Sequence, residues 1–199
     1  MSTRAEQKAA TREAIIDAAL ELSKSAPVSA IGVRELTRQA GIAPASFYRH
    51  FSGVDSLIIE LISQVSGELR ALMRESRKRI QKDGSLIRSS VETFVKYAQK
   101  NPQLFCLLAE DRGSGPDYLK QAIRDVKKVF VDELADDLKK NVRPDDHKER
   151  SEQFVLDAAD IMVNQVFNKG IDMLSAKKAD HPLLKDQLMR QLNLVWYGG

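Results

Sequence analysis

The spacing of apolar residues is the feature that most restricts the fold of this 199-residue chain. Apolar side chains recur three and four positions apart along almost the whole length, and β-branched residues rarely alternate with polar ones. The first pattern puts apolar groups on one face of an α-helix, whereas alternation is what a half-buried strand would need. We therefore predict an all-α protein. Apolar residues make up 43% of the chain, enough to form a substantial core.

Stretches rich in Gly, Pro and Asp divide this pattern into about nine helices. A first helix is expected over residues 4–24, two short ones over 33–40 and 44–50, and a long one from 55 towards 82. Further helices are expected over 85–101, 102–111, 116–140, 147–176 and 182–196.

The two short helices are joined by only three residues, 41–43. Gly41 stands where a helix commonly ends in a left-handed residue, a conformation that glycine adopts at little cost. Pro44 suits the first turn of the helix that follows. This arrangement predicts a helix-turn-helix.

The second short helix begins with small side chains and continues with polar ones. Pro44, Ala45 and Ser46 are small enough to enter a major groove about 12 Å wide. Phe47 is expected to point inward against Val33, Leu36 and Ile42. The polar residues that could reach phosphates, and for the arginine also a base, are Tyr48, Arg49 and His50.

Net charge is only +3, so any binding of nucleic acid must come from a local concentration of positive charge. Residues 1–51 carry seven Lys and Arg against five Asp and Glu. Arg4, Lys8 and Arg12 recur at four-residue intervals along one side of the first helix, where they could follow a phosphate backbone or form an ordinary solvated face.

Residues 33–36 and 40–51 together resemble the signature of the tetracycline-repressor (TetR) family, in which a glycine turn is followed by an aromatic-Tyr-x-His-Phe run. The resemblance implies a DNA-binding domain over 1–52 and an effector-binding and dimerisation domain over 53–199. By position it makes Arg34 a groove-facing residue, Pro44, Ala45 and Ser46 groove-entering residues, and Tyr48 and His50 phosphate clamps.

Two positions depart from the common family pattern. Ala43 occupies the N-cap place without a side-chain oxygen, and Val54 stands where many members have a phosphate-binding lysine. Both departures resemble the FabR and DesT branch, which represses unsaturated fatty acid synthesis, and so do residues 84–91 and 101–108. That branch implies long-chain acyl-CoA or acyl-ACP as effector. A regulator of efflux or detoxification genes that responds to hydrophobic drugs is the open alternative.

A fatty acyl chain needs a long apolar cavity, and the helices between 55 and 140 supply candidates for its walls, although each residue could equally be plain core. The candidates are Leu61, Val65, Leu69, Val91, Phe94, Val95, Phe105, Leu108, Tyr118 and Phe130. A basic stripe could meet the phosphates of coenzyme A or be solvated beside partners such as Glu75. It consists of Arg70, Arg74, Arg77 and Lys78, with Arg88 on the next helix.

The last two helices are expected to form a homodimer through two apolar stripes. The stripes comprise Phe154, Ala158, Met162, Val166 and Phe167, then Leu184, Leu188, Leu192 and Val195. Packing within one chain is the alternative. A symmetric dimer would hold its recognition helices about 34 to 36 Å apart and require a palindromic operator.

The sequence gives little support to other classes of function. His50, His147 and His181 are dispersed, so neither a catalytic triad nor a metal site is expected, and we predict no enzyme and no cofactor. The lone Cys106, among apolar neighbours, is expected to be buried. Since no signal peptide or membrane span is apparent, the cytoplasm is the expected location. A purely structural helical protein is the remaining rival.

Overall fold

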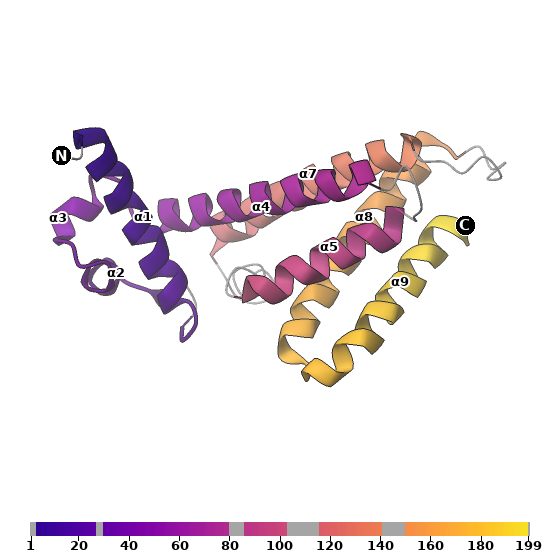
Figure 1. The fold of residues 1–199 in the computed structure, drawn as a ribbon. Helices are drawn as coiled ribbons and strands as arrows, with labels where there is room; N and C mark the ends of the chain where they lie inside the picture. Colours follow the sequence, from indigo (N-terminus) through magenta and orange to yellow (C-terminus); the bar gives the residue numbers. More distant parts are fainter. Residues whose placement is uncertain (1–2, 27–29, 80–85, 103–115, 141–149, 199) are drawn as a thin grey trace.

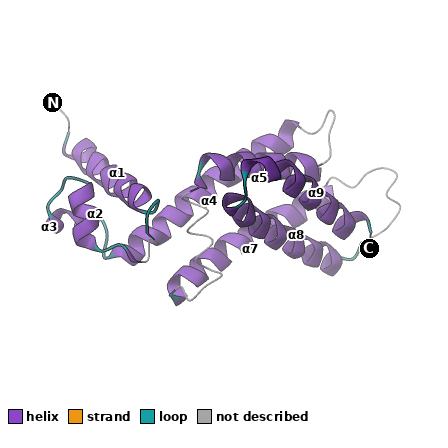
Figure 2. Cartoon of the chain, turned by 90° about the horizontal axis from the view of Figure 1, so that it is seen from below, coloured by secondary structure: helices purple, strands orange, loops and turns teal. Residues whose placement is uncertain are grey.

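The computed structural model describes residues 3–26, 30–79, 86–102, 116–140 and 150–198, and every regular element in this part of the chain is helical (Figures 1 and 2). Three helices form the N-terminal unit: α1 (Arg4–Leu22), α2 (Val33–Gln39) and α3 (Pro44–Phe47). The others are α4 (Val54–Arg79), α5 (Leu86–Lys100), α7 (Asp117–Lys140), α8 (Glu152–Ser175), a 3-10 turn η3 (Lys178–Asp180) and α9 (His181–Tyr197). The all-α prediction is confirmed, and residues 103–111 of the helix expected over 102–111 lie outside the described residues.

Helix α1 begins where expected because Thr3 and Glu6 cap each other. The Thr3 hydroxyl accepts a hydrogen bond from the Glu6 backbone N–H at 3.2 Å, and the Glu6 carboxylate accepts one from the Thr3 N–H at 2.7 Å. This reciprocal pair satisfies two amides that the helix itself leaves unbonded.

The turn between α2 and α3 has the predicted chemistry. Gly41 has φ 67°, Ala43 caps α3 without a side-chain bond, and Pro44 starts the helix. However, α3 ends at Phe47 and not at His50. The reason is that the amides of Arg49 and His50 bond to carbonyls three residues back, at 3.2 and 2.9 Å, so the chain tightens into turns.

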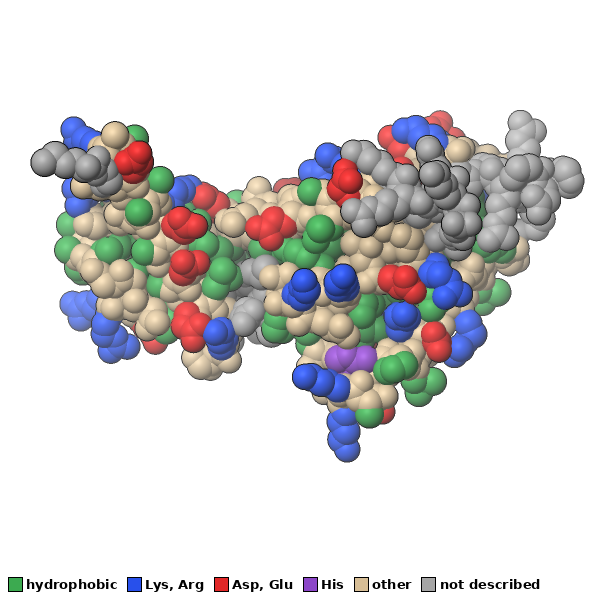
Figure 3. Space-filling model, viewed as in Figure 1, with side chains coloured by type: hydrophobic (Ala, Val, Ile, Leu, Met, Phe, Trp, Pro, Cys, Tyr) green, Lys and Arg blue, Asp and Glu red, His purple; other side chains and the backbone are tan. Residues whose placement is uncertain are grey.

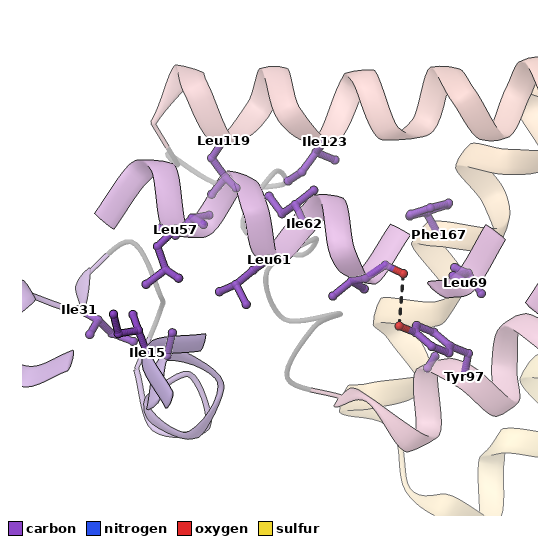
Figure 4. Packing of buried hydrophobic residues seen from close by; sticks show 14 of the residues in the cluster. Ile15, Ile31, Leu57, Leu61, Ile62, Leu69, Tyr97, Leu119, Ile123 and Phe167 are labelled. Carbon is purple, nitrogen blue, oxygen red and sulfur yellow. Dashed lines mark hydrogen bonds between the residues drawn. The ribbon is translucent and has the colours of Figure 1, made fainter. Parts of the chain in front are cut away.

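Helix α4 leaves the three-helix unit and runs into the rest of the molecule, where it packs against α5 and α7 (Figure 1). Helix α8 packs in turn on α7, α9 and α5. One hydrophobic cluster continues from α1 through α4 to α7 and α8, and Figure 4 shows part of it, from Ile15 to Phe167. A second cluster lies among α5, α7, α8 and α9.

Tyr97 ties α5 to the middle of α4. Its buried hydroxyl lies 3.3 Å from the backbone oxygen of Val65 (Figure 4) and 3.0 Å from the carboxylate of Glu68. Burial, followed by the bond to Glu68 and its negative charge, raises the pKa of Tyr97 above its ordinary value, so the phenol stays protonated.

No helix in the described ranges combines the length and the apolar content that crossing a membrane requires.

Candidate functional site

The segment that begins at α3 is exposed and small at its start. Pro44 and Ala45 are exposed and Ser46 is half-buried. Phe47 is fully buried, as predicted, and belongs to the same cluster as Leu36. The buried ring anchors the segment, so the residues before it are held facing solvent at the outer end of the molecule (Figure 1).

Polar groups flank this anchored start. The Tyr48 side chain is 61% exposed, and its ring meets that of Phe47 edge-on with centroids 5.5 Å apart. Arg49 is exposed and donates to the Ser46 hydroxyl at 2.7 Å, so its guanidinium is held over the first turn of α3. The structure thus brings five of the predicted DNA contacts, residues 44–46, 48 and 49, onto one outward segment.

The remaining cations predicted to contact DNA lie on α1 and α2. Arg34 is exposed near the start of α2, and Arg4 is exposed on the first turn of α1, one turn before the exposed Lys8. Figure 3 shows Lys and Arg side chains at the outer edge of this end of the molecule.

His50 is less accessible than expected for a side chain whose role is to contact a DNA phosphate. It is half-buried, and its Nδ1 atom is inaccessible and has no hydrogen-bond partner within the described part of the chain. Burial first, then the positive charges of Lys8, Arg12 and Arg49, lower the pKa of His50. A neutral imidazole could still donate one N–H bond to a phosphate.

Arg12 differs from Arg4 and Lys8 because its guanidinium pairs with other parts of the chain. Its Nε atom donates to Glu60 of α4 at 3.0 Å, and a second, close contact makes the pair bidentate. Its Nη1 atom donates to the backbone oxygen of His50 at 3.0 Å, and its guanidinium lies 4.4 Å from the centre of the Phe51 ring. Arg12 therefore joins α1, the end of the α3 segment and α4.

The cavity closest to the predicted ligand site lies among α4, α5, α7, α8 and α9 and has a volume of about 50 Å³. Val91, Phe94 and Phe130 line it, as predicted. Sequence reasoning missed other wall residues, which are Met73, Leu86, Ile87, Leu134, Met162, Val163, Val166, Phe167 and Leu192. The helical spacing of these apolar residues was visible in the sequence, but such spacing does not show whether a helix face lines a cavity or packs against another helix.

The other predicted ligand residues lie elsewhere. Leu61, Val65 and Leu69 are buried in the cluster around α4 and are not among the residues that line this cavity. Val95 lines a groove of about 1010 Å³ beside α8 and α9, and Tyr118 lines one of about 490 Å³ between α4 and α7. Phe105 and Leu108 lie outside the described residues, as does Cys106.

The wall of the 50 Å³ cavity carries two polar residues, Ser90 and Glu133. Arg70 and Arg74 of α4 each donate to the Oε1 atom of Glu133 at 2.5 Å. Burial alone would raise the pKa of Glu133, but the two guanidinium groups outweigh it and hold that pKa below its usual range. The partner of this part of the basic stripe is thus Glu133 of α7. The side chains of Arg77 and Lys78 lie outside the described set.

The predicted dimer stripes are largely internal. Five of their residues are buried within the single chain, in contacts with α5, α7 and each other, namely Ala158, Met162, Phe167, Leu188 and Leu192. The apolar side chains that α8 and α9 expose are different ones: Ile161, Leu183, Leu194 and Tyr197. The assignment of those five residues to a dimer surface is therefore corrected, because they serve packing within the chain, while Phe154, Val166, Leu184 and Val195 are half-buried and their place in a dimer stays a prediction.

Comparison with known proteins bears on the N-terminal region. Residues 15–61 match the family model of bacterial regulatory proteins of the tetR family. This range covers the C-terminal half of α1, the α2–α3 pair and the first turns of α4.

Solved structures share the whole fold at low sequence identity. A TetR-family transcriptional regulator from Streptomyces coelicolor is 17% identical, with a TM-score of 0.72 and 96% of each chain covered. The fatty acid degradation regulator FadR from Bacillus halodurans is 17% identical, with a TM-score of 0.69 and 94% of each chain covered. FadR from Bacillus subtilis, solved with stearoyl-CoA, is 19% identical, with a TM-score of 0.67, covering 90% of this chain and 96% of its own.

Proposed function

We propose that the chain is a transcriptional regulator of the tetR type, since residues 15–61 match that family's model, and that it represses unsaturated fatty acid biosynthesis genes in response to long-chain acyl thioesters. In this proposal it acts by binding DNA and does not catalyse a reaction. We assign DNA binding to residues 1–52 and effector binding and dimerisation to residues 53–199.

The outward α3 segment is the observation that most supports operator binding. Its exposed Pro44 and Ala45 are small enough to enter a major groove, and buried Phe47 fixes their orientation. Arg34 is the candidate for a base-edge or phosphate contact from α2, and Tyr48 and Arg49 are candidates for phosphate contacts.

The comparisons and the cavity together support an acyl thioester as effector. Two of the similar structures are FadR proteins, one of them in complex with stearoyl-CoA. The cavity here is apolar apart from Ser90 and Glu133, but ligand pockets usually measure about 300 to 1,000 Å³. A long acyl chain would therefore have to displace wall side chains, and the flexible Met73 and Met162 suit such a rearrangement.

A route for the signal runs through the shared hydrophobic cluster. Phe47 under the α3 segment and the cavity residues Phe94, Phe130 and Phe167 belong to that cluster. Widening the cavity would shift α4, to which both ends pack, and so change the spacing of the two recognition segments in a dimer. A differential affinity worth about 1 to 3 kcal/mol would change operator binding about 5- to 150-fold.

Selection of bound fragments from genomic DNA tests this function directly. We expect palindromic sites near unsaturated fatty acid synthesis genes, with occupancy that depends on whether oleoyl-CoA or stearoyl-CoA is present. Sites near degradation genes would correct the target genes. Sites near efflux genes, together with no response to either thioester, would favour a drug-responsive regulator.

A matched pair of variants then tests the interface on the selected site. Arg34→Ala should weaken operator binding about 5- to 150-fold, because one contact to base or phosphate is lost. Arg124→Ala should leave it unchanged, since Arg124 is equally exposed but lies on α7, where its Nη2 atom bonds Gln121. Equal effects of the two substitutions would remove α2 from the interface.

A further inference from the structure

Ser90 lies on the face of α5 that covers the cavity. It shares this face with Ile87, Val91 and Phe94, at offsets of three, one and four residues, and all four line the cavity wall. Apolar side chains surround the hollow on α4, α7 and α8 as well. Ser90 and Glu133 are therefore the polar features of an otherwise apolar chamber.

The hydroxyl of Ser90 has no hydrogen-bond partner among the described residues, and its oxygen is inaccessible to water. A buried hydroxyl in a helix normally bonds back to a carbonyl one turn earlier. The buried Thr37 does so, since its hydroxyl bonds the Val33 oxygen at 2.9 Å, and the more exposed Thr11 makes the same kind of bond to the Gln7 oxygen at 2.8 Å. A buried polar group that forgoes such a bond costs stability and needs an explanation.

The second polar residue limits what could bond to this hydroxyl. Glu133 lines the same chamber, and its paired arginines keep it ionised by lowering its pKa. Neither arginine lines the chamber, so a ligand carboxylate inside it would be buried without a cation of its own, whereas an uncharged carbonyl oxygen needs none. A thioester carbonyl is an uncharged acceptor of this kind.

We infer that Ser90 donates a hydrogen bond to the carbonyl oxygen of a long-chain acyl ester or thioester whose hydrocarbon chain occupies the cavity. This inference rests on the proposed acyl effector and names the contact that would orient it. The apolar walls contact the hydrocarbon chain, and the serine hydroxyl donates to the carbonyl oxygen, which is the hydrogen-bond acceptor at the end of that chain.

The test compares two adjacent serines. Ser90→Ala removes an unsatisfied hydroxyl, so stability to urea in the absence of ligand should hold or rise, while the Kd for oleoyl-CoA should rise about 2- to 12-fold. Ser89→Ala is the control. The Ser89 hydroxyl bonds that of Ser76 on α4, so this substitution should lower stability and leave the Kd unchanged.

Three further probes separate the possible causes. Methyl oleate keeps a neutral carbonyl. Its Kd should therefore rise in Ser90→Ala by the same factor as the Kd for oleoyl-CoA. Oleate should bind more weakly than methyl oleate to the wild type. The hydrocarbon 1-octadecene has no acceptor, and its binding should be the same in both proteins.

Each outcome decides the matter. The role of Ser90 would be overturned if Ser90→Ala weakened the binding of 1-octadecene by the same factor. It would also be overturned if Ser90→Ala bound methyl oleate as tightly as the wild type. Binding of methyl oleate but not oleoyl-CoA, with the predicted loss, would support Ser90 and reject the thioester effector. If the wild type bound none of the four probes, the inference would be overturned, and operator selection would still test the repressor function independently.

Discussion

At the scale of single residues, His50 combines a predicted contact role with an unfavourable environment for charge. Burial of its imidazole, and after that the positive charges of Lys8, Arg12 and Arg49, lower the pKa of His50. The folded protein therefore binds a proton at this site less readily than the unfolded chain, whose histidine has a pKa of about 6.5.

This difference predicts how acidification affects stability. Above about pH 6.5 the histidine is neutral in both states and the folded protein keeps its full stability. As the pH falls below that value the unfolded chain gains the proton first, so stability declines until the lowered folded-state pKa is reached. Urea unfolding at a series of pH values should show a smaller decline in this window for His50→Gln than for the wild type. Identical slopes in the two proteins would contradict the lowered pKa.

At the scale of helices, Arg12 shows how α1 and α4 are held at a set angle. Its bidentate pair with Glu60, its bond to the His50 carbonyl and its stacking on Phe51 join three segments at one point. We propose that Arg12 orients the α3 segment through these contacts without touching DNA, and that the exposed Lys8 one turn earlier contacts phosphates.

The salt dependence of operator binding should separate these roles. Arg12→Ala should weaken binding, because α3 loses its fixed angle to α4, but leave the slope of log K against log salt unchanged. Lys8→Ala should reduce the magnitude of that slope by about 0.9, the value for one phosphate contact. Arg12→Lys should not restore affinity, since an ammonium cannot make the planar bidentate pair. If Arg12→Ala reduced the magnitude of the salt slope, Arg12 would contact a phosphate directly.

Comparison of predicted and observed helices shows what local pattern can reveal. The α2–α3 turn was predictable because Gly41 and Pro44 each have a strong conformational preference, confirmed by the φ of 67° and the N1 proline. The early end of α3 was not, since it depends on backbone bonds to residues 46 and 47 that no side-chain pattern encodes.

The contacts of the candidate site were harder to predict than its helices. Val91, Phe94 and Phe130 line the cavity as predicted, but Leu61 and Leu69 have the same apolar character and serve as core. Only tertiary packing distinguishes the two. Likewise the state of the Ser90 hydroxyl depends on neighbours from other helices.

At the scale of the whole molecule, α8 and α9 leave apolar side chains exposed after their buried faces have been used within the chain. Leu194 is 71% and Leu183 is 67% exposed. Covering such residues with a second copy is the arrangement that we propose for the dimer, because a palindromic operator needs two linked recognition segments.

Charge placed in this surface should separate the subunits. Leu194→Glu is expected to weaken dimerisation at least about tenfold, or about 1.4 kcal/mol, because a carboxylate would be buried without a partner. Sedimentation velocity should then show monomer, and operator affinity should fall with it. Leu72→Glu, at an exposed leucine of α4, is the matched control and should remain dimeric. An unchanged dimer in Leu194→Glu would mean that another surface joins the subunits.

The cluster that runs unbroken from Ile15 and Phe47 through Leu57 to Phe167 also bears on how proteins with this architecture can be rearranged. Under the proposed function, a DNA-binding unit transferred from another tetR-family protein and joined at residue 52 would meet side chains of α4 that pack against a different neighbour here. The N-terminal three-helix unit and the rest of the molecule are therefore less interchangeable than their separate proposed roles would suggest. A change of operator preference is more easily reached by altering exposed residues around Pro44 than by exchanging whole modules.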